Sequence, residues 1–312
     1  MATVHVSNNF IQSQAKVITT VFDNSTPEAP VSWSEFFNEW DGDEARSFFQ
    51  FMPVYGFGTL GTVDEGQAMP LDAGGEGIPS YFPYTSMGLK YGISLVGRTE
   101  DPKAISKRFP KFLRYAEDQT VELVSWNILI QGWNSSVTLW DNQPLFSTAH
   151  ALQGTNATYS NNLGNVALSV ESWQAACSLL AISLDDRGLA TFKTPFWLVG
   201  PVGIQQQIEE ITTSKFYPYS DENRKNIAYG KTNPYISRYL QPQIGAGPFP
   251  WYVTAGKGEI GSDCHAMFVS FKYRHSQEVW YDNDTRNMYH STLMRFTLGT
   301  GDGRGQVGSQ GA

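Results

Sequence analysis

The stretch from Pro110 to Trp133 constrains the fold more than any other part of the chain. Pro110 suits a first helical turn, where a missing N–H loses no hydrogen bond, and Gly132 suits a helix end with left-handed backbone geometry. A helix of this length spans roughly 30 Å. Apolar side chains recur in it at steps of three and four residues, which places them on one helical face: Phe112, Leu113, Ala116, Thr120, Leu123, Val124 and Ile130. We predict a long amphipathic helix that acts as a spine.

Composition favours strands around this helix. The 312 residues, 14% of them aromatic, include 29 glycines and 16 prolines, which is typical of many turns and half-buried strands. The chain is long enough for one large domain or two smaller ones. We therefore expect a β-rich α+β fold.

The net charge of −8 argues against a surface that grips phosphates, because such surfaces gather lysine and arginine. Cys177 and Cys264 are too few for a disulfide framework, and the first residues do not resemble a signal peptide. We expect a chain made in a reducing cytosol. No run of 18 apolar residues exists, so no membrane span is predicted.

The first half of the chain divides into two segments before the spine. Residues 1–47 are polar and predict a disordered segment or, as we favour, an ordered extended arm. The aromatic cluster between Trp33 and Trp40 is the exception and predicts a short helix over an apolar surface. Residues 48–98 predict a two-stranded ribbon around a Gly-rich polar tip. An isolated ribbon is marginal in water, so it either rests on a neighbouring subunit or packs as an ordinary hairpin on its own domain.

Beyond the spine, helices are predicted at 170–183 and 202–214, and strands near 192–201, 233–243, 248–256, 266–282 and 289–299. The Gly-rich tail from 299 to 312 is expected to be flexible.

Few residues are candidates for chemistry. Ser147 and His150 could form a nucleophile and base, but catalytic partners meet through the fold rather than by adjacency, so a structural histidine is favoured. Cys264 and His265 would point to opposite faces of a strand. Asp282 begins a weak match to a calcium loop that lacks the closing glutamate. We predict no catalytic residue, no metal and no cofactor.

The order of segments carries a resemblance over nearly the whole chain. The spine is preceded by a polar arm, a ribbon with Glu65-Gly66 at its tip, the returning strand YTSMGLKYGISLV and the acidic turn RTEDP. It is followed by PLFSTAH, the Asn-Asn-Leu at 161–163, FWLVGP and RFTLGTGDGRGQVGSQGA. PLFSTAH with Asn-Asn-Leu is the most specific piece. The chain resembles a tailed-bacteriophage major capsid protein of the Hong Kong 97-like shell fold, of the type found in Mu-like phages and prophages.

The resemblance implies a domain layout. Residues 1–47 would be the N-terminal arm and 48–98 the E-loop that lies across an adjacent subunit. Residues 99–165 would be the peripheral domain with its spine helix, and 166–265 the axial domain. Residues 266–312 would return to the peripheral domain as strands and end in a tail.

The resemblance also implies the function. The chain would assemble with itself, as pentamers and hexamers, into the icosahedral shell that encloses double-stranded DNA without sequence-specific binding. It would be part of the virion, assembled in the bacterial cytoplasm, with no enzymatic activity. Scaffold and portal proteins, and in some phages decoration proteins, would be partners. Because arm-like sequence begins at once, we expect a separate scaffold protein rather than a cleaved scaffold segment.

Some shells of this fold join neighbours by an isopeptide bond from an E-loop lysine. From Phe57 to Leu89 this chain has no lysine, so we expect no such bond. Two rival hypotheses remain: a hydrolase using Ser147 and His150, and a monomeric β-rich binding module. The expected subunit-contact residues are Trp33, Phe36, Phe37, Trp40, Glu65, Lys90, Arg114 and Glu117.

Overall fold

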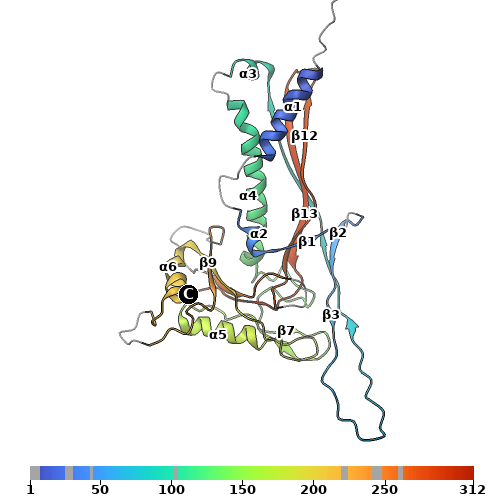
Figure 1. Cartoon of the computed structure of the whole chain (residues 1–312), viewed down its shortest axis with the longest axis vertical. Coiled ribbons are helices and arrows are strands. Elements are labelled where there is room, and N and C mark those ends of the chain that lie inside the picture. The colour runs from blue at the N-terminus through green and yellow to red at the C-terminus, as the bar shows by residue number, and fades with distance from the viewer. Residues whose placement is uncertain are drawn as a thin grey trace, which may run out of the picture.

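The computed structural model describes residues 8–24, 31–42, 45–101, 105–218, 224–240, 248–258 and 263–312. It is an elongated molecule in which the helix α4 (Phe109–Ile130) and the strands β12 (Met267–Tyr281) and β13 (Met288–Thr300) run side by side along the long axis (Figure 1). Helices and strands are mixed around two four-stranded sheets. The predicted α+β class is confirmed.

The first sheet has the order β1-β12-β13-β6. The strand β13 pairs antiparallel with both β12 and β6 (Thr85–Ile93), and the short β1 (Asn38–Asp41) pairs parallel with β12. The spine helix α4 packs over β13 and β6. Strands distant in sequence therefore meet beneath this one helix, as a spine requires.

The second sheet has the order β10-β9-β11-β14. Its strands are β10 (Asn233–Ser237), β9 (Trp197–Pro201), β11 (Trp251–Thr254) and β14 (Gln306–Ser309). Helices α5 (Val170–Ala181) and α6 (Gln205–Thr213) cover it, preceded in the case of α6 by the 3₁₀ turn η2 (Val202–Ile204). A second apolar core forms between these helices and the sheet around Trp173, Ile208 and Trp251.

The C-terminal tail is not flexible, which corrects the expectation from its composition. All four residues of β14 are buried and pair with β11. A Cβ on Gly308 would lie 2.9 Å from the ring of Phe146. The glycines therefore allow close packing, rather than conferring mobility.

The spine helix is confirmed, and its ends differ slightly from the prediction. The 3₁₀ turn η1 (Ile105–Arg108) leads into it, Pro110 lies in its first turn, and it ends at Ile130. The left-handed geometry expected at Gly132 is absent, since Gly132 is not among the glycines with positive φ. A Cβ there would lie 2.5 Å from the ring of Phe146, so close approach explains this glycine.

The N-terminal arm contains a helix that the sequence did not predict. Helix α1 (Asn8–Asp23) packs along α4 and β12, and Phe22 near its end is fully buried. The expectation of an extended arm is therefore wrong over α1, while residues 1–7, 25–30 and 43–44 lie outside the described residues. The predicted short helix in the aromatic cluster is present as α2 (Trp33–Phe36).

The ribbon has paired strands only at its base. There β2 (Phe48–Phe51) pairs with β5 (Ser80–Pro83), and β3 (Val54–Tyr55) pairs with β4 (Gly75–Glu76). Residues 56–74 belong to no strand and project away from the body of the molecule (Figure 1). The short helix α3 (Leu95–Thr99) follows β6 at the opposite end.

Candidate functional site

The ribbon exposes large apolar side chains to an unusual degree. Leu60 is 100% exposed and Leu71 is 98% exposed. Monomeric proteins do not usually leave clustered apolar surface in water, so such a surface indicates a contact with another molecule. The exposed apolar residues of the ribbon include Val54, Phe57, Leu60, Val63, Met69, Leu71 and Ile78. Its glycines and acids predict a polar tip, and the exposed apolar side chains differ from that prediction.

The base of the ribbon is held by Asp72. Its carboxylate accepts a hydrogen bond from the Gly58 N–H at 2.8 Å and forms an ion pair with Arg187, which lies in the loop after α5. The hydrogen bond with Arg187 and that with Gly58 lower the pKa of Asp72 to about 2. Gln153 accepts a further bond from the Ile78 N–H at 2.6 Å. These contacts fix the direction in which the ribbon leaves the subunit.

The spine helix turns a different face to the core than its apolar periodicity predicted. Leu113 is buried, but Phe112, Leu123 and Ile130 are 48%, 57% and 44% exposed. The buried face instead includes three acidic residues, which no sequence pattern predicted to be buried: Glu117, Asp118 and Glu122.

Glu122 anchors the arm to the spine. Its carboxylate accepts hydrogen bonds from the backbone N–H of Ser32 and of Trp33, from the Ser32 hydroxyl at 2.8 Å, and from the Trp126 indole at 2.9 Å. The N-terminal N–H groups of a helix need acceptors, and α2 finds them in this carboxylate.

The other two buried acids face basic side chains of the same subunit. The Arg114 Nε lies 3.3 Å from an Asp118 oxygen, and the His275 Nδ1 lies 2.9 Å from a Glu117 oxygen. Burial raises the pKa of Asp118, and Arg114 opposes that rise only in part. The guanidinium also lies over the Phe22 ring of α1. Arg114 and Glu117, which we expected at a subunit contact, thus hold arm, spine and sheet together within one chain.

The aromatic cluster predicted at a subunit contact is placed inside the subunit for the most part. Trp33, Phe36 and Phe37 are at most 1% exposed and belong to the main apolar core. This corrects the expectation, because buried rings leave no surface for a neighbour. Trp40 is half-buried and stacks on Phe268 with ring centroids 4.7 Å apart.

The remaining two candidates are exposed. Glu65 lies in the turn at the tip of the ribbon, and Lys90 lies on β6 with its ammonium 5.8 Å from the Tyr289 ring centroid. Contact of Glu65, Lys90 or Trp40 with a neighbour stays a prediction.

The geometry does not bring Ser147 and His150 together. The His150 Nδ1 lies 2.8 Å from an Asp141 oxygen and its Nε2 lies 3.2 Å from the Leu145 carbonyl oxygen. The Ser147 hydroxyl donates to Gln143 instead. His150 is buried at the start of the hairpin β7 (His150–Ala151) and β8 (Thr158–Tyr159), so it serves as a structural histidine.

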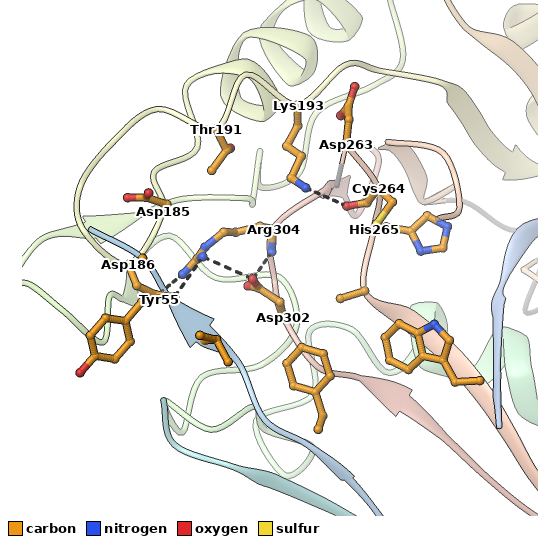
Figure 2. Close-up of a pocket in the computed structure, with 15 residues that line it drawn as sticks. Tyr55, Asp185, Asp186, Thr191, Lys193, Asp263, Cys264, His265, Asp302 and Arg304 are labelled. Carbon is orange, nitrogen blue, oxygen red and sulfur yellow. Dashed lines mark hydrogen bonds and ion pairs between the residues drawn. The ribbon is translucent and has the colours of Figure 1, made fainter. Parts of the chain in front are cut away.

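A cavity of about 370 Å³ lies between the ribbon base, the loop after α5, the segment that leads into β12 and the turn between β13 and β14 (Figure 2). Arg304 lies between Asp186 and Asp302 and pairs with both, while the Lys193 ammonium donates to the Cys264 carbonyl. Burial alone would lower the pKa of Arg304, but these carboxylates raise it above its usual value. The charged groups that line the cavity are thus engaged with protein partners.

His265 also lines this cavity, and it is neutral at physiological pH. Burial lowers its pKa to about 4, and its Nε2 donates to the Phe36 carbonyl at 3.0 Å. Among the described residues, no cluster of three or more histidine, cysteine or acidic side chains could hold a metal ion. In that same part of the chain, no helix is long and apolar enough to cross a membrane.

Comparison with solved structures identifies the fold. The chain is similar to the mature capsid of bacteriophage PhiM1, with 8% identity, a TM-score of 0.58 and coverage of 93% of this chain and 89% of that one. The capsid of cyanophage P-SCSP1u gives 9% identity, a TM-score of 0.61 and coverage of 93% and 90%. The capsid of bacteriophage JBD30, decorated with minor capsid protein trimers, gives 8% identity, a TM-score of 0.56 and coverage of 76% of this chain and 100% of that one.

The protein therefore has the fold of a virus shell subunit. More particularly, it has the Hong Kong 97-like fold of tailed-bacteriophage capsids, as the resemblance in sequence implied. No family model matches the sequence, and neither does any curated protein. The likeness thus lies in three-dimensional structure and in the order of segments, at sequence identities of 8 to 9%.

Proposed function

We propose that this chain is the major capsid protein of a tailed bacteriophage, which assembles with itself into the closed icosahedral shell around double-stranded DNA. The single observation that carries the proposal is the ribbon, whose apolar side chains project into water in a subunit with the fold of phage capsids. A second copy that covers the ribbon removes this surface from water. Repetition of modest contacts with closed symmetry then gives a stable shell.

The domain layout follows the same proposal. Residues 1–47 act as the arm, 48–98 as the E-loop, 99–165 and 266–312 as the peripheral domain, and 166–265 as the axial domain around the five-fold and six-fold axes. Residues 306–309 are an exception to this layout, because they form β14, which pairs with β11 in the sheet of the axial segment. Scaffold and portal proteins are the further partners, with a decoration protein as a third. The protein acts in the virion and assembles in the bacterial cytoplasm.

The proposal assigns no catalysis to the chain. The hydrolase alternative loses its support because neither nitrogen of His150 faces Ser147. Replacement of Ser147 by alanine should leave particle yield within about twofold of wild type, since one partly buried hydroxyl bond contributes about 1 kcal/mol. A hydrolytic activity that disappears in this variant would restore the enzyme hypothesis.

Particle size tests the proposal. The purified protein, alone or with its scaffold, should sediment as capsomers or closed shells and appear as such in negative stain. A species of 34.8 kDa at every salt, protein concentration and scaffold ratio would instead favour the monomeric binding module.

A further inference from the structure

The spine helix α4 and the first sheet do not close completely against each other. A cavity of about 260 Å³ lies between them. The helix contributes residues to it at steps of three and four, and the strands contribute from the face that they turn toward the helix. The lining residues are Leu113, Ala116, Glu117 and Thr120 of α4, Met87, Gly88 and Leu89 of β6, and Thr292 and Met294 of β13. The wall is therefore apolar except for one carboxylate and two hydroxyls.

Two polar groups of this wall have no hydrogen-bond partner among the described residues. Glu117 is 3% exposed, and neither of its carboxylate oxygens accepts a hydrogen bond. The Thr292 hydroxyl is also buried and unpaired, whereas the Thr120 hydroxyl donates to the Ala116 carbonyl. A buried carboxylate without donors is costly, and native structures rarely leave one so. The cavity thus offers acceptors to a ligand that brings its own donors.

The charges around Glu117 indicate the sign of that ligand. Arg114 forms an ion pair with Asp118, the neighbouring carboxylate. His275 approaches Glu117 to 2.9 Å but makes no hydrogen bond with it. While His275 is neutral, two carboxylates share one guanidinium, so the cluster is one positive charge short. Folding has already removed water from Glu117, so an entering cation adds only its own desolvation cost.

A second cavity continues from the first toward the start of α4. It has a volume of about 310 Å³ and shares Leu89 and Leu113 with the first cavity. Its remaining lining is largely aromatic: Tyr91, Gly92, Phe109 and Phe112. Leu89 is 57% exposed and Phe112 is 48% exposed, so this end is open to solvent. Five residues separate Phe112 from Glu117, which is roughly 7.5 Å along the helix and within reach of a short alkyl chain.

We propose that this double cavity binds a linear primary alkylammonium ion. The ammonium donates to the Glu117 carboxylate and to the Thr292 hydroxyl, and the alkyl chain runs past Leu113 into the second cavity. An alcohol lacks the charge that Glu117 selects, and a carboxylate has the wrong one. A diamine would lose the hydration of its far ammonium in the apolar second cavity. The bound ion joins spine and sheet within one subunit, so this inference does not depend on the proposed shell function.

Calorimetric titration of the full-length, unassembled wild-type subunit tests the site, with hexylammonium chloride as the probe. Hexylammonium should bind at one site and raise the thermal midpoint. Each methylene added between butylammonium and hexylammonium should tighten binding about fourfold. Hexanol, hexanoate and 1,6-diaminohexane should each bind at least about tenfold more weakly, because none of them pairs a single ammonium with an apolar tail. Absence of hexylammonium binding, or equal binding of hexanol, would overturn the inference.

Two variants locate the ammonium. Glu117→Gln keeps the size of the side chain without its charge and should weaken hexylammonium binding by at least about tenfold, while Thr292→Val should weaken it by about fivefold. The control Glu209→Gln makes the same change at an exposed position of α6 and should bind like wild type. Wild-type affinity in Glu117→Gln would place the ammonium elsewhere and refute the assignment. If Glu117→Gln does not fold, the probe series on the wild-type subunit decides the question alone.

Discussion

At the scale of single residues, the most consequential side chain is Glu122. It is fully buried, yet it accepts hydrogen bonds from two backbone N–H groups, a hydroxyl and an indole. These donors come from the arm and from α4 itself, so one carboxylate joins segments 90 residues apart in sequence. A buried charge is tolerated only with such complete pairing.

Replacement of Glu122 by alanine should therefore destabilise the subunit by about 3 kcal/mol, because several buried donors lose their acceptor at once. Denaturant unfolding of the unassembled protein measures this difference. The exposed Glu209 on α6 is the matched control, and its alanine variant should stay within about 0.5 kcal/mol of wild type. Equal effects of the two substitutions would contradict the role given to Glu122.

His265 should make stability depend on pH. Burial lowers its pKa from 6.5 to about 4, so between these values the unfolded chain binds a proton that the folded chain does not. The free energy of unfolding then falls as pH decreases from 6.5 to 4, by about 3 kcal/mol in total from this group, and no further below pH 4. His265→Gln keeps a donor for the Phe36 carbonyl and should flatten that part of the pH profile. Parallel profiles for the two proteins would refute this assignment.

At the scale of elements, the ribbon is separable from the core. The Asp72 carboxylate reaches the Gly58 N–H, so the two ends of the segment between them lie close together. Replacement of residues 59–71 by two glycines should leave the thermal midpoint of the unassembled subunit nearly unchanged, because the lost side chains are exposed. The same variant should not form shells. Loss of a cooperative unfolding transition would show instead that the ribbon belongs to the core.

The elements also show what a sequence can and cannot predict. The spine and the helices near 170 and 205 were predictable because each has a strong helical period or a serine cap, such as Ser169. Helix α1 was not, because its sequence is largely polar and its stability comes from docking on α4. The strand β14 was not predictable because its sequence is rich in glycine, which is typical of a flexible tail but is needed here for tight packing against Phe146.

The candidate contact surface was predictable only in outline. The ribbon could be located from its extended aromatic strands, but its exposed leucines looked like part of a polar loop. Phe112 and Leu123 looked like core residues, since periodicity identifies a face without saying which face is covered. Their exposure follows from the burial of Glu117 and Glu122, whose partners lie far away in sequence.

At the scale of the whole molecule, the shell should be held by non-covalent contacts alone. From Phe57 to Leu89 the ribbon has no lysine, and Lys90 lies on β6, which pairs with β13 of its own subunit. Mature particles boiled in denaturant should run as a single band near 34.8 kDa. A ladder of multimers that persists after reduction would indicate a covalent link, and Lys90 would be the first residue to replace.

The central claim is that an exposed apolar ribbon makes this subunit complete only within a shell. An electron cryomicroscopy reconstruction of the assembled protein tests it most directly. We predict an icosahedral shell of this subunit in which residues 56–74 are covered by a neighbouring copy. A protein that remains a monomer under every assembly condition, or a shell in which that segment stays uncovered, would contradict the account.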